Sequence, residues 1–394
     1  MPPMFFSCWI FLLLFSCNSG NKGQDREGTG DKAVSISFEK LDSIQIDFLG
    51  IPVVHDIDPS SRKVLFMDNK EFSPEIHVAD FEGKILASFL KSGDSPDSYG
   101  GLMSTLRIRD ENTFLVYGYN GFMVYDFEGT LKSQVMLDDF EVPSTNWINM
   151  GFGMEKLGNR YVYINLEKPP FTSQEFKEFQ LLSWLNPENG EKEPFIQFPE
   201  SSVFRNGNYF FPKSWFPVYT LEEGRIHIVF GSDPVIYEFE KQPPYSLIST
   251  IPLNLPDYSQ FKGSDHPKDG RLFGMGMISG RIENIKKIGG FFIVAYFPGY
   301  NSLDTEAHFE NKSLAESTLF RERMQKKYPA RIGILDSLGN LINDFVPEGL
   351  VANSMLIRNG ELWMQEKPDE EVERDYFRLF RVGLKVNEPY NNDD

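Results

Sequence analysis

Ile76-His-Val-Ala-Asp80-Phe-Glu-Gly83-Lys-Ile-Leu86 is the stretch that decides the fold, because its pattern recurs along the chain. It has the composition of a strand, a turn and a second strand. The Asp80 side chain can bond nearby backbone to open the turn, and Gly83 supplies the positive φ that closes it. Three further copies are clear: Phe122-Met-Val-Tyr-Asp126-Phe-Glu-Gly129-Thr-Leu131, Leu182-Ser-Trp-Leu-Asn186-Pro-Glu-Asn-Gly190 and Ile332-Gly-Ile-Leu-Asp336-Ser-Leu-Gly339-Asn-Leu341.

Two more copies are degenerate: Val235-Ile-Tyr-Glu-Phe-Glu240 and Phe377-Arg-Leu-Phe-Arg-Val382. Each of the six copies follows another strand-like run, rich in β-branched and aromatic residues, at 63–67, 113–117, 160–164, 225–229, 291–295 and 361–364. Six such units, each with material for a four-stranded sheet, predict an all-β fold, the six-bladed β-propeller.

The last unit lacks a fourth strand, because little strand-like sequence follows Val386. Ser43-Ile-Gln-Ile-Asp-Phe48 is a spare strand ahead of the first unit. We therefore expect this N-terminal strand to complete the sixth sheet and close the ring. A seven-bladed ring and two separate β-domains are the alternatives that the sequence leaves open.

The first residues are apolar from Met4 to Phe15, interrupted only by Ser7. This run is about half of the roughly 20 residues that a membrane-spanning helix needs, and small residues follow it, as in secretory signals. Leu14-Phe15-Ser16-Cys17 resembles the lipobox of bacterial lipoproteins. The resemblance implies a signal peptide at 1–16 that is cut before Cys17, and lipidation of Cys17. A plain secretory signal with an incidental cysteine is the alternative.

Residues 17–34 are rich in Gly, Asn, Ser and charge, so we expect a flexible tether between the lipid and a propeller at 35–394. Two or more acyl chains hold a protein firmly on a membrane. The expected location is therefore the cell envelope, on the outer membrane, facing either the periplasm or the cell surface. Once Cys8 leaves with the signal, Cys17 is the only cysteine, so no disulfide and no cysteine-based metal site are expected.

The formal net charge is −18, from 57 acidic and 39 basic residues. Nucleic acid is therefore excluded as an expected partner, because phosphate binding needs clustered Lys and Arg.

The hairpin repeat, the stretch Lys91-Ser-Gly93-Asp-Ser-Pro96 and the lipobox together resemble the six-bladed, TolB-like β-propeller lipoproteins of Gram-negative bacteria. Many members of that family are described only as a domain of unknown function. The resemblance covers residues 35–386 and implies a fold and a location. It implies no activity, since one fold carries many functions.

Long loops are predicted to gather on one face of the ring. In a propeller, the links between blades and the loops between second and third strands share a face, opposite the short Asp-x-x-Gly turns. All the long segments belong to that set: 91–101, 138–145, 167–178, 199–213, 254–277, 298–329 and 366–374. We call this side the long-loop face. Loops of this length usually carry a function.

The longest of these loops, 298–329, is predicted to carry a helix. Ser313-Leu-Ala-Glu316 is a capping box that marks its start. Phe320, Met324 and Tyr328 share one stripe of that helix, which we expect to pack onto the blades. A partner-binding lid is the alternative.

The candidate ligand-binding residues are Tyr209, Phe211 and Trp215 in an aromatic loop, with Arg271 and Arg281 as nearby cations. Aromatic rings at this density stack on sugars, anchor peptides or simply seal a loop against the blades. The two arginines could meet an anionic group, or act as solvated surface charge.

Motifs for catalysis or metal binding are absent, including the nucleophile elbow, H-E-x-x-H, the P-loop and the Rossmann glycine pattern. On a regular strand, Asp56 and Asp58 share a face and His55 points away, so no metal site is expected there. Asp265, His266 and Asp269 are interpreted as a polar loop. We expect no cofactor, no metal and no catalytic residue.

The leading functional hypothesis is a membrane-tethered, non-catalytic protein that binds an envelope protein or a glycan through the long-loop face. A scaffold within an envelope complex differs from it only in the partner. The alternative is a hydrolase or lyase whose loop carboxylates and Arg271 converge in the central funnel.

Overall fold

The computed structural model describes residues 35–68, 75–136, 150–165, 170, 172–222, 224–310, 312–369, 372 and 374–387. The predicted signal peptide, Cys17, the tether and loop 138–145 lie outside the described residues.

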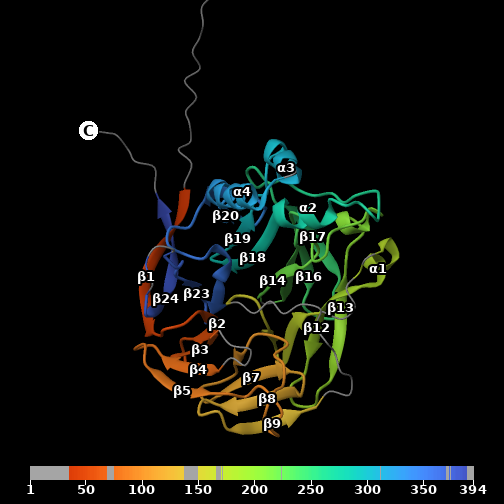
Figure 1. Ribbon diagram of the computed structural model, residues 1–394. Coiled ribbons are helices and arrows are strands. Elements are labelled where there is room, and N and C mark those ends of the chain that lie inside the picture. The colour runs from red at the N-terminus through yellow and green to blue at the C-terminus, as the bar shows by residue number, and fades with distance from the viewer. Residues whose placement is uncertain are drawn as a thin grey trace, which may run out of the picture. The chain divides into compact units, whose positions relative to one another are not determined.

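Six four-stranded antiparallel sheets are arranged in a ring, which confirms the six-bladed propeller (Figure 1). The blades are numbered from the first sheet after the N-terminal strand. Blade 1 contains β2 (Pro52–Asp58), β3 (Lys63–Asp68), β4 (Ile76–Asp80) and β5 (Ile85–Phe89). Blade 2 contains β6 (Arg107–Ile108), β7 (Thr113–Gly118), β8 (Gly121–Asp126) and β9 (Leu131–Val135). Blade 3 contains β10 (Glu155–Leu157), β11 (Arg160–Ile164), β12 (Gln180–Leu185) and β13 (Lys192–Gln197). Blade 4 contains β14 (Pro217–Glu222), β15 (Arg225–Phe230), β16 (Val235–Glu240) and β17 (Leu247–Pro252). Blade 5 contains β18 (Arg281–Ile288), β19 (Phe291–Phe297), β20 (Arg331–Leu335) and β21 (Leu341–Phe345).

Blade 6 combines the two ends of the propeller, as predicted. It contains β22 (Leu356–Arg358), β23 (Glu361–Gln365), β24 (Tyr376–Asn387) and β1 (Ser35–Asp47), in the spatial order β1-β24-β23-β22. The pairing of β1 with β24 runs from Ser35 opposite Asn387 to Asp47 opposite Tyr376. The closing strand therefore begins well before Ser43, where the sequence pattern placed its start.

The repeated glycine of the Asp-x-x-Gly turn serves two purposes. Gly83 has a φ of +85°, which closes the turn on the Asp80 carbonyl. A Cβ at Gly83 would also lie 1.9 Å from the carbonyl oxygen of Gln45 in β1, in the neighbouring blade. The equivalent glycines Gly129 and Gly339 face β5 and β17, the outer strands of their preceding blades. The glycine of the repeat is therefore needed both for the geometry of the turn and for close contact between neighbouring blades.

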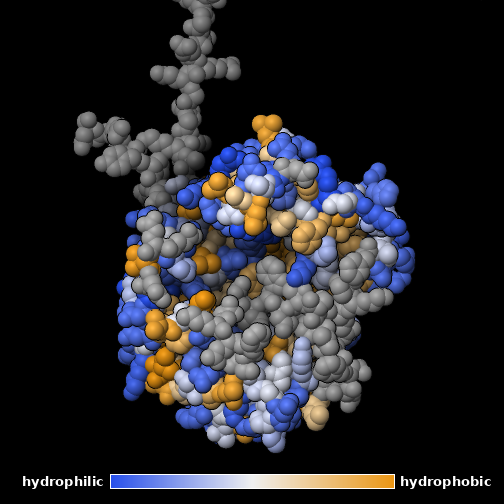
Figure 2. Space-filling view, viewed as in Figure 1, coloured by the Kyte–Doolittle hydropathy of each residue, from blue (hydrophilic) through white to orange (hydrophobic). Residues whose placement is uncertain are grey.

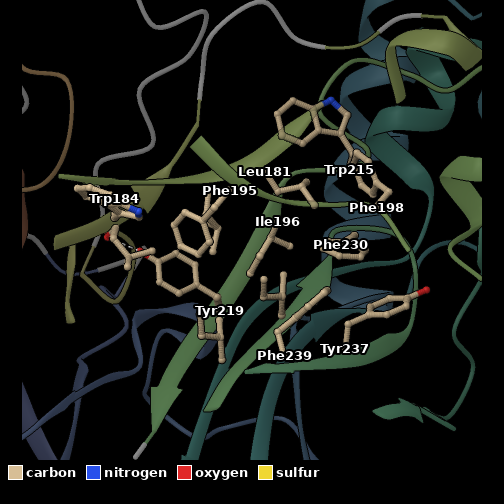
Figure 3. Close-up of a cluster of buried hydrophobic side chains, with 14 of the residues drawn as sticks. Leu181, Trp184, Phe195, Ile196, Phe198, Trp215, Tyr219, Phe230, Tyr237 and Phe239 are labelled. Atoms are coloured by element: carbon tan, nitrogen blue, oxygen red, sulfur yellow. Dashed lines mark hydrogen bonds between the residues drawn. The ribbon is translucent and has the colours of Figure 1, made fainter. Parts of the chain in front are cut away.

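The hydrophobic core lies between the faces of adjacent blades. Figure 3 shows one such cluster, in which strands of blades 3 and 4 contribute Trp184, Phe195, Tyr219 and Phe239. Equivalent clusters fill the other blade interfaces. Because residues 35–394 contain no cysteine, this packing holds the ring together without a disulfide.

The described part of the chain contains four α-helices and two short 3₁₀ helices, although the sequence predicted a single helical insertion. They are α1 (Ser173–Glu178), α2 (Leu272–Ile278), α3 (Ser302–Phe309), α4 (Leu314–Lys327), η1 (Val203–Arg205) and η2 (Ala352–Ser354). The predicted helix is α4, and the capping box of Ser313 and Glu316 is present. None of the helices in the described ranges has the length and hydrophobicity needed to cross a membrane.

Helix α2 was missed because two glycines give it a low helix propensity. Its tertiary contacts explain both of them. A Cβ at Gly274 would lie 2.5 Å from the Phe309 ring, and one at Gly276 would lie 3.1 Å from Phe211. The helix forms because these aromatic rings pack directly on its backbone.

Candidate functional site

Strand alternation places the described parts of the long loops on one face of the ring. Backbone hydrogen bonds join several of these loops to one another. Tyr209 and Ser264 exchange two such bonds, of 2.7 and 2.8 Å, and the Tyr300 N–H donates to the Ile278 carbonyl at 2.8 Å. Over blades 4 and 5 the long-loop face is therefore a continuous layer of protein.

Helices α2, α3 and α4 form the most prominent part of this layer, and we call them the helical cap (Figure 1). Arg271, which immediately precedes α2, donates to Glu306 of α3 at 3.0 Å. Asp304 of α3 accepts from Lys327 at the end of α4. Phe320 and Met324 of α4 are buried, so the predicted stripe packs inward, as expected.

Five large apolar side chains on the cap remain in contact with solvent. Their exposed fractions run from 52% to 86%: Phe273 and Met277 on α2, Leu303 on α3, and Leu314 and Leu319 on α4. Phe273 and Met277 are four residues apart on one helix, so they lie on the same side of it. Figure 2 shows hydrophobic side chains across these helices, among polar ones. Exposed apolar groups gathered in one region mark interaction sites in soluble proteins.

The aromatic residues predicted to bind a ligand lie mostly inside the protein. Phe211 and Trp215 are only 7% and 3% exposed. Phe211 packs against Phe261 at 5.6 Å between ring centroids, and Trp215 meets Phe179 edge to face at 4.9 Å. Trp215 belongs to the cluster drawn in Figure 3. Tyr209 is partly buried and bridges to Ser264 through its backbone. In this arrangement the aromatic loop is sealed against the blades.

The two candidate arginines are engaged with protein groups. Arg271 bonds Glu306 and lies over the ring of Phe309 at 4.1 Å. Arg281 bonds Glu283 at 3.0 Å and lies over Phe297 at 4.5 Å. Among the residues that the structure describes, no hydrogen bond, ion pair or ring contact joins any two of the five predicted ligand-binding residues. The structure does not bring them together in one pocket.

Charged side chains from five blades meet near the ring axis, on the innermost strands, and of these only Asp56 was singled out from the sequence. The Asp56 carboxylate in blade 1 is fully buried. It accepts from Arg107 Nη1 of blade 2 at 3.3 Å, from Arg358 Nε of blade 6 at 2.9 Å, and from the backbone N–H of Ile108 at 2.7 Å. Arg358 Nη2 makes a second contact to the same carboxylate.

This axial network continues into blades 3 and 5. Arg107 Nη2 donates to Glu155 of blade 3 at 3.1 Å. Lys286 of blade 5 is buried, and its Nζ donates to the carbonyl of Gly151 at 3.3 Å. Burial lowers the pKa of Lys286 to about 8, and the nearby Glu155 carboxylate limits that decrease.

His55 does not point away from Asp56, contrary to the sequence prediction. The pairing of β2 with β3 shifts register between Val54 and Asp56, so His55 is the extra residue of a β-bulge and the alternation of side chains breaks there. His55 Nδ1 accepts from the backbone N–H of Leu106 at 3.0 Å, and Asp56 accepts from Ile108 in the same segment of blade 2. Both side chains therefore fasten blade 1 to blade 2. No group of three or more His, Cys, Asp or Glu side chains in the described ranges is arranged to hold a metal ion.

A short segment, residues 150–154, links opposite sides of the ring. Met150 packs in the cluster of blades 6 and 1, Phe152 in that of blades 4 and 5, and Met154 in that of blades 2 and 3. Between them, Gly151 contacts Lys286 and the carbonyl of Met355. We call this stretch the axial segment.

A cavity of about 10 Å³ lies beside the axial segment, which is room for about one water molecule. Its lining is formed by Gly151, Phe152, Gly153, Glu155, Ile164, Pro217, Val218, Tyr219 and Asn284. The hydrolase or lyase alternative expected Arg271 to converge with loop carboxylates in the central funnel. Arg271 lies instead on the cap, where it bonds Glu306, and so contributes nothing to the axial network. The axial charges bond one another, which is the arrangement of a structural tie between blades.

The fold defines the class: the chain is a six-bladed β-propeller. No protein-family model matches the sequence, and no curated protein matches it significantly. Among solved structures, a DUF4221 family member from Bacteroides vulgatus is 10% identical, with a TM-score of 0.65 over 90% of this chain and 99% of that one. A putative exported protein from Bacteroides fragilis is 12% identical, with a TM-score of 0.47 over 90% of this chain and 96% of that one. A gluconolactonase from Xanthomonas campestris is 7% identical, with a TM-score of 0.43 over 89% and 95%. At such identities the similarity establishes the fold alone.

Proposed function

We propose that the chain is a lipid-anchored protein of the cell envelope whose propeller binds a partner protein, without catalysis, through the helical cap on its long-loop face. The observation that carries the proposal is the set of five solvent-exposed apolar side chains on α2, α3 and α4. Leaving a Leu or Phe side chain in water forgoes about 1.5–3 kcal/mol of burial free energy, which a partner can recover.

The chemistry of this surface favours a protein over a glycan. Sugar rings are recognised by exposed aromatic faces with polar groups around them. Of the three aromatic residues predicted to bind a ligand, Phe211 and Trp215 are buried and Tyr209 is partly buried. The cap offers Leu, Met and Phe on helices, which is the composition that binds apolar side chains of another protein.

The proposed anchor is the lipid on Cys17, followed by the tether at 17–34. Ser35, the first residue of β1, pairs with Asn387 at the end of β24, the third strand of blade 6. Third strands end at the short-turn face. Ser35 therefore lies at the short-turn end of blade 6, whereas helices α2, α3 and α4 belong to loops of the other face.

Site-specific photo-crosslinking tests the binding surface. A photoreactive residue placed at Met277 of the full chain, expressed in a bacterial host that processes lipoproteins, should yield a discrete crosslinked protein. Combining Phe273→Ser, Leu303→Ser and Leu314→Ser should abolish that product. The matched control is Leu247→Ser with Ile248→Ser, two exposed apolar residues on the outer strand of blade 4, which should leave it intact. If the crosslinked product still forms in the variant with the three cap substitutions, the proposed binding surface is wrong.

Cys17→Ser tests the anchor separately. The variant should lose incorporation of radiolabelled fatty acid and move from the membrane fraction to the soluble fraction. A variant that stays on the membrane would refute lipid anchoring, and it would leave the binding surface to be judged by the crosslinks alone.

A further inference from the structure

Helix α4 of the cap carries net positive charge, in contrast to the protein as a whole. The net charge of the chain is −18, yet α4 contains the four cations Arg321, Arg323, Lys326 and Lys327. Its two carboxylates are Glu316 and Glu322. A basic helix on an acidic protein requires a reason, since added acidic charge would serve solubility equally well.

Some of these charges are already engaged within the cap. Lys327 pairs with Asp304 of α3 at 2.5 Å. Glu316 bonds the Ser313 backbone in the capping box at 2.8 Å, where it also complements the dipole of the helix N-terminus. The Lys327–Asp304 pair holds α4 against α3, so Lys327 and Glu316 are charges of α4 that the protein itself uses.

Three cations remain on the outside of α4: Arg321, Arg323 and Lys326, all exposed. None of them forms an ion pair among the described residues, and a single carboxylate, Glu322, lies between them in sequence. Leu319, Arg323 and Lys326 are spaced by four and three residues, so an exposed apolar side chain shares its face of the helix with two cations. Leu314 and Arg321 are spaced by seven and share another.

From this we propose that the partner of the helical cap is an acidic protein segment in which Asp or Glu alternates with apolar side chains. The proposal rests on the function proposed above and specifies the partner. The leucines supply burial, and the three cations attract carboxylates and set the register of binding. At the rim of an interface such charges act mainly on the association rate and give the binding a strong dependence on salt.

The cations and leucines of α4 could also bind an anionic membrane, because its charge is equally complementary to that of the helix. The net charge of −18 favours a protein segment, because an extended anionic membrane would also meet the acidic remainder of the propeller, whereas a short segment can meet α4 alone. A second copy of this acidic chain is the remaining occupant. The experiment below distinguishes all three.

Selection from a random peptide library tests the chemistry before the partner itself is identified. The library is displayed on phage and selected against the full chain carrying Cys17→Ser, which avoids detergent. Enriched peptides should combine Asp or Glu with Leu, Ile, Val or Phe. When synthesised and measured by fluorescence anisotropy, they should bind more weakly as salt rises.

Charge reversal then locates the site. Arg321→Glu, Arg323→Glu and Lys326→Glu together should weaken peptide binding by at least about tenfold and remove its salt dependence. The matched control reverses three exposed lysines on other blades, Lys84→Glu, Lys132→Glu and Lys385→Glu, so the change in net charge is the same. Equal weakening in both variants would show a general charge effect and overturn the inference.

Two further measurements separate the alternatives. Binding of the Cys17→Ser chain to phosphatidylglycerol vesicles, lost on charge reversal of α4, would replace the protein partner by a membrane. Self-association in analytical ultracentrifugation, lost in the same variant, would replace it by a second copy. If the serine variants of the cap abolish the crosslink and the α4 reversal leaves it unchanged, the proposed function stands and the acidic partner is refuted.

Discussion

Arg358 donates from Nε to the Asp56 carboxylate at 2.9 Å, joining the last blade of the ring to the first across 302 positions of sequence. Arg107 of blade 2 bonds the same carboxylate. One buried acid therefore holds three blades at the axis. Removing a single partner from such a group leaves buried charges uncompensated, which costs more than the pair contributes while intact.

Asp56→Ala should consequently destabilise the fold by about 3–5 kcal/mol, because Arg358 loses its carboxylate inside the protein and Arg107 keeps only Glu155. Urea unfolding followed by circular dichroism measures the change. The control is Glu82→Ala, which removes the partner of Arg62 in an exposed pair and should cost less than about 1 kcal/mol. Equal losses in the two variants would show that the axial network contributes no more than a surface pair.

His55 should make stability depend on pH. Burial lowers its pKa from 6.5 to about 3, although the Asp56 charge opposes this shift. The unfolded chain therefore takes up the proton first, and stability should fall as pH decreases from about 6.5 towards 3, by up to about 1.4 kcal/mol per pH unit.

His55→Gln keeps an acceptor for the Leu106 N–H and removes the titrating group. The difference in unfolding free energy between pH 7 and pH 5 should be smaller in this variant than in the parent. Comparing the two proteins cancels the contributions of the other histidines. An unchanged pH dependence would show that His55 is not the responsible group.

Gly83→Ala should cost more than Gly360→Ala, although both glycines have positive φ, +85° and +78°. The Gly360 variant should lose only the conformational term of about 1–2 kcal/mol, since no atom lies within 4 Å of its added Cβ. The Gly83 variant adds a clash with the Gln45 backbone in β1. Thermal unfolding of both variants provides the test, and equal costs would argue against close contact between blades at this turn.

Ring closure through β1 predicts a dependence on its buried side chains. Ile46→Ala should destabilise the whole propeller by about 2–5 kcal/mol, because Ile46 is fully buried between blades 6 and 1. Leu41→Ala, at a half-exposed position of the same strand, should change stability by less than about 1 kcal/mol. Denaturation midpoints that move equally would show that β1 is not an integral part of the core.

The repeated features of the fold could be predicted from the sequence, whereas contacts that occur only once in the ring could not. Asp80 and Gly83 predict their turn because four hairpins share the pattern. The spare strand at 43–48 could be assigned to blade 6 because the last unit is one strand short of four. Arg107, Glu155, Lys286 and Arg358 carry no pattern, since each lies alone on the inner strand of a different blade and meets the others only in the folded ring. The bulge at His55 reversed an inference from strict strand alternation.

The candidate site was foreseen in part. The predicted sorting of loops agrees with the strand order, and α4 was placed by its capping box. The aromatic residues were predicted to bind a ligand because of their density in one loop. In the structure, Phe211 and Trp215 are buried and pack inside the protein. Leu303 and Leu314 stand out because their side chains are exposed. Their exposure depends on how α3 and α4 lie against each other, and no local sequence pattern encodes that packing.

The pairing of β1 with β24 has a consequence for how the protein is made. Within the propeller, residues 35–47 are synthesised before every other strand, while their partner strand β24 is synthesised after all the others. A chain that stops before Tyr376 leaves β1 without a neighbour and blade 6 with a bare edge. In truncated products the ring should therefore stay open, and these products should aggregate and be cleaved readily by proteases. Closure of the ring therefore waits until β24 has been synthesised, because blade 6 combines the earliest strand of the propeller with the latest.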